Sequence, residues 1–198
     1  MARHPHPRSR AGLIGNIYAT LTTLGGPLIT LYLSNRLARG REDANRSDER
    51  RGIAGRPRPP GPLTWIHAAS IGEALSVLRL IEQLLARYPA LNILITTGTV
   101  TSARLLATRL PDRAIHQYVP VDRPAWVKNF LDHWHPDAAM WVESELWPNL
   151  VFAAQARSIP MVLLNARMSA RSFARWRRLK KFGKRLLAGF SLVMAQDG

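Results

Sequence analysis

Beyond residue 62, short apolar runs alternate with longer amphipathic segments along the chain. The apolar runs have the length and composition of buried strands, and we predict them at Thr64–Ala68, Asn92–Thr96, Ala114–Tyr118, Ala138–Val142, Met161–Leu164 and Leu192–Ala195. Helices are predicted between them, at Glu73–Tyr88, Thr101–Leu110, Pro124–His135, Pro148–Arg157 and Ser169–Leu187. Apolar strands that alternate with helices are typical of a parallel sheet covered on both faces. The pattern therefore predicts an α/β fold with a doubly wound, parallel, Rossmann-like sheet.

The N-terminal part of the chain has a different pattern. Residues 11–34 carry no charged side chain, and arginines flank this run on both sides. A helix needs about 20 apolar residues to cross a bilayer core, so the run is long enough for a membrane-anchor helix within residues 1–38. A buried core helix is the alternative. Gly25, Gly26 and Pro27 lie in the middle of the run and favour a kink, and the sequence leaves open whether the helix spans the membrane or lies in its interface.

Residues 39–62 have the composition of a basic linker. They are rich in arginine, glycine and proline, and they end in the string Arg56-Pro-Arg-Pro-Pro-Gly-Pro62. This proline density excludes a strand or a long helix at that end. The sequence thus predicts an anchor segment at 1–38, a linker at 39–62 and a Rossmann-like domain at 63–198.

Composition limits the chemistry. The chain has no cysteine, which excludes disulfides, cysteine-bound zinc and thiol nucleophiles. It carries 28 Lys and Arg against 13 Asp and Glu, a net charge of +15, which favours phosphate-bearing partners such as nucleic acid, anionic lipid or a phosphorylated sugar. Residues 167–185 hold nine basic residues, no acidic one and an apolar stripe. This stretch is typical of a solvated basic helix or of a helix at an anionic lipid surface, and no known nucleic-acid-binding motif accompanies it.

The first candidate for chemistry is Ser70-Ile-Gly-Glu73, directly after the first predicted strand. Gly72 allows a ligand close to the backbone, and Glu73 falls near a helix N-terminus, where an ionised carboxylate is stabilised and can accept a proton from an attacking hydroxyl. The alternative is structural, because Ser70 and Glu73 also have the spacing of a capping box. His67, on the strand itself, is interpreted as a core residue.

The loop that begins with Thr96 and Thr97 and runs to Ser102 joins the second strand to its helix. Hydroxyls and free N–H groups at a helix N-terminus suit a phosphate or a sugar. An ordinary N-cap in a connecting loop explains the same residues.

The most specific signal is Glu143-Ser-Glu-Leu-Trp-Pro-Asn149, where Glu143 ends a strand and Glu145 lies in the following turn. Two carboxylates this close can bind sugar hydroxyls or tune a base, although solvated loop acids beside a packed Trp147 are the alternative. Asn165-Ala-Arg-Met-Ser169 follows the next strand end.

Together, these segments resemble the N-terminal half of the Kdo transferases. Those enzymes move 3-deoxy-D-manno-octulosonic acid (Kdo) from CMP-Kdo to the lipid A precursor, lipid IVA, in lipopolysaccharide biosynthesis. The resemblance implies the acceptor-binding half of a two-domain GT-B glycosyltransferase, without its CMP-binding half. It implies Glu73 as the catalytic base and an acceptor site at Ser70, Gly72, Thr96, Thr97, Glu143, Glu145, Asn165 and Arg167.

The resemblance also implies no metal and no cofactor besides the donor CMP-Kdo, and no nucleic-acid partner. The partners that the resemblance implies for this chain are the lipid A precursor and the cytoplasmic face of the inner membrane, and the domain is expected on that side. The family's threonine-rich loop commonly closes with glycine where this chain has Ser102. Two other functions fit the residues: another membrane-surface GT-B glycosyltransferase, or a non-catalytic basic module that binds membrane or nucleic acid.

Overall fold

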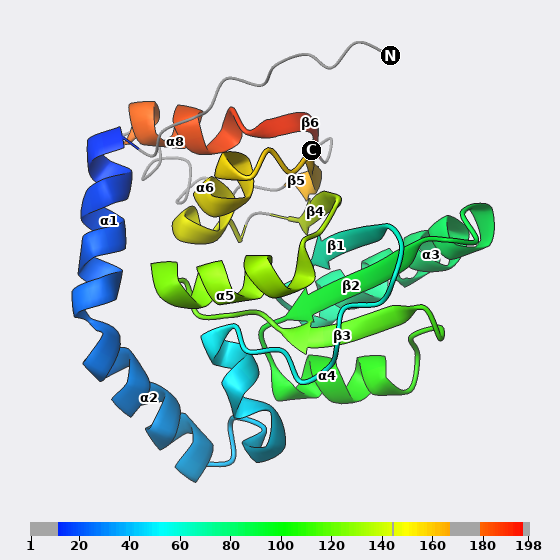
Figure 1. The fold of residues 1–198 in the computed structure, drawn as a ribbon, viewed down its shortest axis with the longest axis horizontal. Helices are drawn as coiled ribbons and strands as arrows, with labels where there is room; N and C mark the ends of the chain where they lie inside the picture. Colours follow the sequence, from blue (N-terminus) through cyan, green and yellow to red (C-terminus); the bar gives the residue numbers. More distant parts are fainter. Residues whose placement is uncertain (1–11, 144, 167–178, 196–198) are drawn as a thin grey trace.

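The computed structural model describes residues 12–143, 145–166 and 179–195. Its centre is a parallel sheet of six strands in the order β3-β2-β1-β4-β5-β6 (Figure 1). The strands are β1 (Leu63–His67), β2 (Asn92–Thr97), β3 (Ala114–Tyr118), β4 (Ala138–Val142), β5 (Met161–Ala166) and β6 (Phe190–Ala195). This order is that of the Rossmann fold, so the predicted doubly wound parallel sheet is confirmed.

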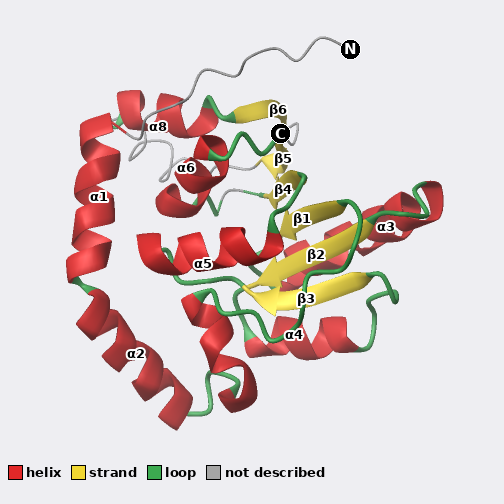
Figure 2. Cartoon of the chain, in the orientation of Figure 1, coloured by secondary structure: helices red, strands yellow, loops and turns green. Residues whose placement is uncertain are grey.

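Helices cover both faces of the sheet (Figure 2). One face packs against α3 (Ile71–Arg87) and α4 (Val100–Ala107), and the other against α5 (Pro124–Trp134), α6 (Pro148–Ala156) and α8 (Lys180–Leu187). Pro124 and Pro148 occupy first helical turns, where the missing N–H has no cost. Of the helix predicted at Ser169–Leu187, residues 179–187 fall within the described residues, and α8 begins there at Lys180.

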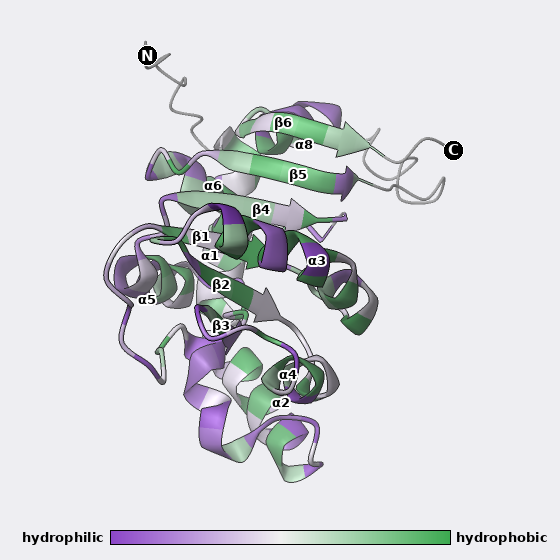
Figure 3. Cartoon of the chain, turned by 90° about the vertical axis from the view of Figure 1, so that its right-hand side faces the viewer, coloured by the Kyte–Doolittle hydropathy of each residue, from purple (hydrophilic) through white to green (hydrophobic). Residues whose placement is uncertain are grey.

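The two apolar cores follow from the alternation of side chains along each strand. Trp65 of β1 faces α5 and meets Trp141 of β4 edge to face, with ring centroids 4.7 Å apart, whereas Ile66 faces α3. Figure 3 shows the apolar character of the strands, for example along β5 and β6. The inner strands β1 and β2 are buried on both faces and form continuous apolar runs, which is why the sequence reveals them, whereas β6 at the edge of the sheet exposes Leu192, Val193 and Met194.

The N-terminal segment differs from the prediction of one anchor helix. It forms two helices, α1 (Gly12–Leu24) and α2 (Gly26–Ala38), which meet at Gly25. Pro27 explains the break, since a proline is tolerated in the first turn of α2 but not inside a continuous helix. Within the described residues, no helix combines the length and the apolarity that crossing a membrane requires.

The linker prediction is also incomplete, because part of residues 39–62 packs against the sheet. A short 3-10 helix, η1 (Ala44–Arg51), lies along the outer edge of β3. The Arg46 guanidinium donates to the His116 carbonyl oxygen (2.9 Å), and the Glu49 carboxylate accepts from the Tyr118 N–H (2.7 Å). These side chains satisfy backbone groups that an edge strand leaves unpaired. Three charged residues of the segment are buried as a result: Glu42, Glu49 and Arg50.

Candidate functional site

The strand order places a topological switch point between β1 and β4. From β1, the chain continues on one side to β2 and β3, and later on the other side to β4, β5 and β6. Ligands of doubly wound sheets bind outside the carboxyl ends of the strands at such a point. The segments predicted to carry chemistry follow the two flanking strands, Ser70–Glu73 after β1 and Glu143–Glu145 after β4.

Glu73 is buried and held in a variant of the capping box. Its Oε2 accepts the N–H of Ala69 (2.7 Å), and its Oε1 accepts the hydroxyl of Ser70 (2.9 Å). In return, the N–H of Glu73 donates to Ser70 Oγ (3.3 Å). Ser70 is therefore the N-cap of α3, as the structural interpretation predicts, but the Glu73 carboxylate accepts from the Ala69 N–H, one residue before the N-cap. Each carboxylate oxygen keeps a second lone pair, so the capping box also fixes a proton acceptor at the switch point.

Two strand ends beside Glu73 have unusual backbone geometry. Glu143 (φ 60°) and Asn165 (φ 54°) are left-handed, and they follow Val142 and Leu164, which pair in register across β4 and β5. Asparagine tolerates this region, but for glutamate it has a steric cost. Backbone strain such as that at Glu143 is typical of functional sites.

Glu145 lies near enough to Glu73 for the two charges to interact. The Glu145 side chain is exposed at the surface, yet partial burial raises the pKa of its carboxyl, the negative charge of Glu73 adds to the shift, and a hydrogen bond with Trp147 opposes it. Glu145 and Glu73, one carboxylate from each segment, therefore interact through their charges.

Thr96 and Thr97 are placed differently from the predicted acceptor contacts. Both are fully buried. Thr96 Oγ1 accepts the indole N–H of Trp65 (2.9 Å) and lies 3.0 Å from His67 Nδ1, while Thr97 Oγ1 lies 2.9 Å from His116 Nε2. Their hydroxyls are engaged inside the protein, and we assign them a role in holding the strand ends together. His67 is a core residue, as interpreted from the sequence, and burial lowers its pKa to about 4.

The remaining predicted residues are Gly72 and Arg167. Gly72 is exposed, and a Cβ built on it would meet no protein atom nearer than Ser70 Oγ at 4.0 Å, so the space beside it is open. Arg167 lies outside the described residues, and its role stays a prediction. In the described part of the chain, no group of three His, Asp or Glu could hold a metal ion.

Sequence reasoning missed Asp122, which lies in the loop between β3 and α5. Its carboxylate is buried and accepts the backbone N–H groups of Asn149 and Leu150, at 3.0 and 2.8 Å. It therefore caps α6, the helix that follows the Glu143–Asn149 segment. No spacing rule connects Asp122 to that helix, because the two are far apart in the sequence.

A separate groove of ≈ 640 Å³ runs along the outer edge of β3. Arg46, Glu49 and Asp112 line it, together with apolar side chains of α4. It lies at the edge strand rather than at the switch point, so it is not part of the candidate site.

The fold and the site together define a doubly wound α/β domain with two interacting carboxylates, Glu73 and Glu145, at its switch point. The chain belongs to the 3-deoxy-D-manno-octulosonic-acid transferase (kdotransferase) family, whose model matches residues 45–198.

Relatives named 3-deoxy-D-manno-octulosonic acid transferase agree. The probable mitochondrial transferase of Arabidopsis thaliana is 42% identical over 89% of this chain, and those of Rickettsia bellii and Haemophilus influenzae are 38% and 35% identical over 91%. The chain spans 40–43% of the length of these three relatives. A solved structure of Phytolacca americana UGT2 is similar over 63% of this chain and 33% of its own, at 17% identity and a TM-score of 0.39.

Proposed function

We propose that the protein transfers Kdo from CMP-Kdo to a lipid A precursor and that this chain is the acceptor-binding half of a GT-B enzyme. The observation that carries the proposal is the fixed carboxylate of Glu73 at the switch point of the sheet, with Glu145 near enough to interact with its charge. Family membership supports the sugar that is transferred. The cytidine-binding half would lie in sequence outside these 198 residues.

In the proposed reaction, a hydroxyl of the acceptor attacks the anomeric carbon of Kdo. A new carbon–oxygen bond forms, the bond from that carbon to the phosphate breaks, and CMP leaves with the bonding electrons. Glu73 takes the proton of the attacking hydroxyl as general base. Glu143, Glu145 and Asn165 would bind acceptor hydroxyls, since Glu143 and Asn165 lie at the ends of β4 and β5 and Glu145 lies in the turn after β4. No metal takes part in this scheme.

The direct test is transfer by the protein as its gene encodes it, with CMP-Kdo and lipid IVA as substrates. We expect a product heavier by one Kdo or more, detected by mass spectrometry, and none without CMP-Kdo. Transfer of another sugar from another nucleotide in place of Kdo would contradict the proposal and indicate a different glycosyltransferase activity.

Arg167 is proposed to bind a phosphate of the acceptor, because arginine binds phosphate by charge-assisted and often bidentate hydrogen bonds. Removing one such contact costs about 1.5–3 kcal/mol. Acceptor binding should therefore weaken in Arg167→Ala, at high salt and with a dephosphorylated acceptor. Equal affinity for the phosphorylated and dephosphorylated acceptors would contradict this contact.

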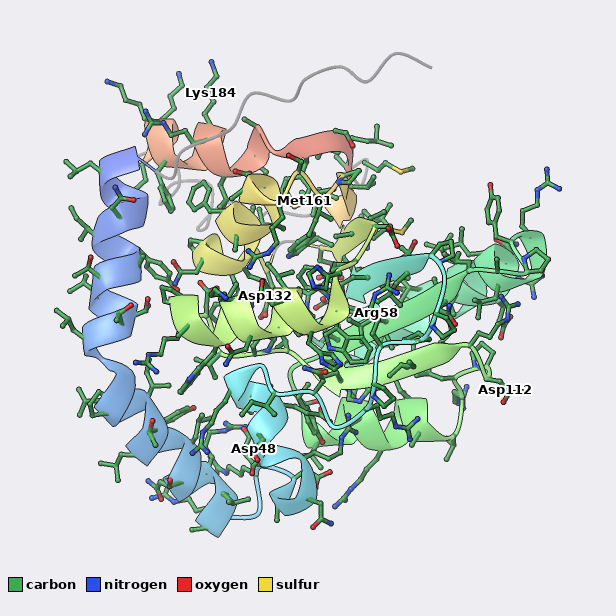
Figure 4. The ribbon with its side chains drawn as sticks, viewed as in Figure 1. Asp48, Arg58, Asp112, Asp132, Met161 and Lys184 are labelled. Carbon is green, nitrogen blue, oxygen red and sulfur yellow. The ribbon has the colours of Figure 1, made fainter. Side chains whose placement is uncertain are left out.

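The N-terminal helices are proposed to lie on the cytoplasmic face of the inner membrane. Apolar side chains spaced three and four apart form an exposed stripe along α1 and α2: Ile14, Ile17, Leu21, Leu24, Leu28 and Leu31. The basic end of α8 contacts α1, and Lys184 points away from the body of the protein (Figure 4). An apolar stripe beside exposed lysines suits an anionic lipid interface.

Vesicle binding tests this placement. The double variant Leu21→Ser/Leu28→Ser should lose most of its sedimentation with vesicles that contain phosphatidylglycerol, because both side chains are largely exposed (63% and 73%). Thr23→Ser, on the exposed side of α1, is the matched control and should bind as the wild type does. Unchanged binding of the double variant would place the lipid contact elsewhere.

A further inference from the structure

Helix α6 begins at the switch point without a side-chain cap of its own. Trp147 occupies its N-cap position and makes no capping hydrogen bond. The first N–H groups of a helix need partners outside the helix, and Pro148 removes one of them. The two that follow, on Asn149 and Leu150, donate to the carboxylate of Asp122. The start of α6 is therefore held by a residue from a different loop.

The Asn149 side chain extends this junction to α1. Its amide Nδ2 donates to the backbone oxygen of Asp122 (2.6 Å) and to Thr22 Oγ1 (3.0 Å). The Thr22 hydroxyl donates its own hydrogen within α1, toward the carbonyl oxygens of Tyr18 (3.0 Å) and Ala19 (3.1 Å). Its lone pair is thus free to accept from Asn149. The hydroxyl of Tyr18 hydrogen-bonds to the Asp122 carboxylate.

Helix α1 is arranged for this contact in an unusual way. Its outward side carries the apolar stripe, whereas Tyr18 and Thr22 turn inward with the buried Gly15. An ordinary surface helix buries its apolar side and exposes its polar one. Polar side chains on the inward side have a reason here, since each makes a hydrogen bond at the junction around Asp122.

We propose that Asp122 is a positioning residue for the acceptor site: it fixes Glu145–Trp147 by capping α6 and ties that segment to α1. The inference rests on the proposed function for the identity of the acceptor. Glu145–Trp147 directly precede α6, so the position of the first turn of α6 fixes the position of this segment. Asp122 itself touches no reacting group in this scheme.

The Asp122 carboxylate is buried, so the hydrogen bonds that it accepts stabilise the junction. Burial raises the pKa of Asp122 to about 6, and the hydrogen bonds from Asn149, Leu150 and Tyr18 oppose that shift. A buried acceptor with several donors leaves them all without partners when it is removed. In Asp122→Asn, one oxygen becomes an NH₂ group, which cannot accept from an N–H, so at least one bond is lost while the shape is kept.

The test combines hydrogen exchange with a kinetic comparison, both in the protein as its gene encodes it. In Asp122→Asn, we expect the Asn149 and Leu150 amides to exchange about tenfold faster or more, as befits the loss of a hydrogen bond to a charged group. The KM for lipid IVA should rise by a similar factor, while the KM for CMP-Kdo stays within about twofold. A purely structural role would not separate the two KM values.

The link to α1 has its own variants. Tyr18→Phe/Thr22→Val removes two hydroxyls from the junction and leaves Asp122 in place, so we expect faster exchange at the same two amides and a higher KM for lipid IVA, each by a smaller factor. The matched control is Tyr32→Phe/Thr23→Val, because Tyr32 is exposed on α2 and the Thr23 hydroxyl donates to the Ala19 carbonyl oxygen within α1. The control should match the wild type in both measurements.

The outcomes separate this inference from the proposed function. If the wild type transfers no Kdo, the proposed function fails, and faster exchange in Asp122→Asn and in Tyr18→Phe/Thr22→Val, but not in the control, still supports the junction. If the wild type is active and the KM for lipid IVA stays unchanged in Asp122→Asn, the positioning role is overturned. Unchanged exchange at Asn149 and Leu150 overturns it as well.

Discussion

Helices α3 and α6 begin at the same edge of the sheet, on either side of the switch point. The free N–H groups in their first turns are capped in different ways. Helix α3 is capped within its own first turn, by Ser70 and Glu73. Helix α6 is capped by Asp122, whose partner Asn149 lies 27 positions away. The local cap fixes one carboxylate at the edge. The remote cap fixes the segment Glu145–Trp147 and joins it to α1. One side of the site therefore depends on residues of a single helical turn, and the other depends on contacts between distant parts of the chain.

The largest expected effect concerns the local cap. Glu73→Gln keeps both side-chain hydrogen bonds, because its oxygen can accept from Ala69 and its NH₂ can donate to Ser70 Oγ. The negative charge, and with it the ability to take a proton, is removed, and loss of a general base costs about 10²–10⁴-fold in rate. The measurement is turnover of CMP-Kdo with lipid IVA at saturating substrates.

Glu82→Gln is the matched control for Glu73→Gln. Glu82 lies on α3, and its side chain is 56% exposed, so its substitution should leave turnover unchanged. A Glu73→Gln enzyme that keeps turnover within a few-fold of the wild type would reduce Glu73 to a helix cap.

The contrast between the two caps also explains what the sequence could predict. The spacing of Ser70 and Glu73 is a local rule, and the strands are continuous apolar runs, so both were predicted. Asp122 follows no such rule, since its partners come together only when α6 packs beside α5 and α1. The Pro148-Asn149 pair was visible in the sequence, but nothing in it indicated that a remote carboxylate caps those residues.

In the N-terminal segments, too, the sequence does not reveal contacts with distant parts of the chain. Composition alone indicates a linker at residues 39–62, yet Glu49 and Arg50 are buried because they find partners on β3 and in the neighbouring loops. The uncharged run at residues 11–34 predicts membrane contact, which stays a prediction, and the structure divides the run into two helices with an exposed apolar stripe. The inward polar side of α1 was not predicted, because its partner Asp122 lies in a distant loop.

An intermediate effect is expected from the charge state of Asp122. Its pKa is 3.8 in the absence of interactions and about 6 in the folded protein. Between these values the folded state binds more protons than the unfolded state, so Asp122 makes the free energy of unfolding fall as pH rises from about 4 to 6. The two-unit difference corresponds to roughly 3 kcal/mol. Asp122→Asn should lack this fall in urea unfolding at a series of pH values.

Asp132 is a useful comparison, because its pKa is shifted in the opposite direction from that of Asp122. Hydrogen bonds from Lys128 and Arg157 lower its pKa to about 2, so its contribution to stability is present above pH 3.8 and lost as pH falls through 2. Asp132→Asn should therefore leave the region between pH 4 and 6 unchanged. If Asp122→Asn and the wild type have the same pH profile there, the Asp122 carboxyl is not as buried as its contacts indicate.

The smallest effect is expected from Ser70, and it tests whether the local cap acts only through helix stability. Ser70→Ala removes the acceptor for the Glu73 N–H and the hydroxyl that holds Glu73 Oε1, and loss of such a cap costs about 1 kcal/mol. Thr99→Ala is the matched change on α4, because Thr99 Oγ1 caps that helix by accepting from Ser102 N–H (3.1 Å). Equilibrium unfolding should give similar losses for both variants. Turnover should fall only in Ser70→Ala, since only there does a carboxylate at the switch point lose one of the two bonds that orient it. Equal turnover in the two variants would mean that the Ala69 N–H alone orients Glu73.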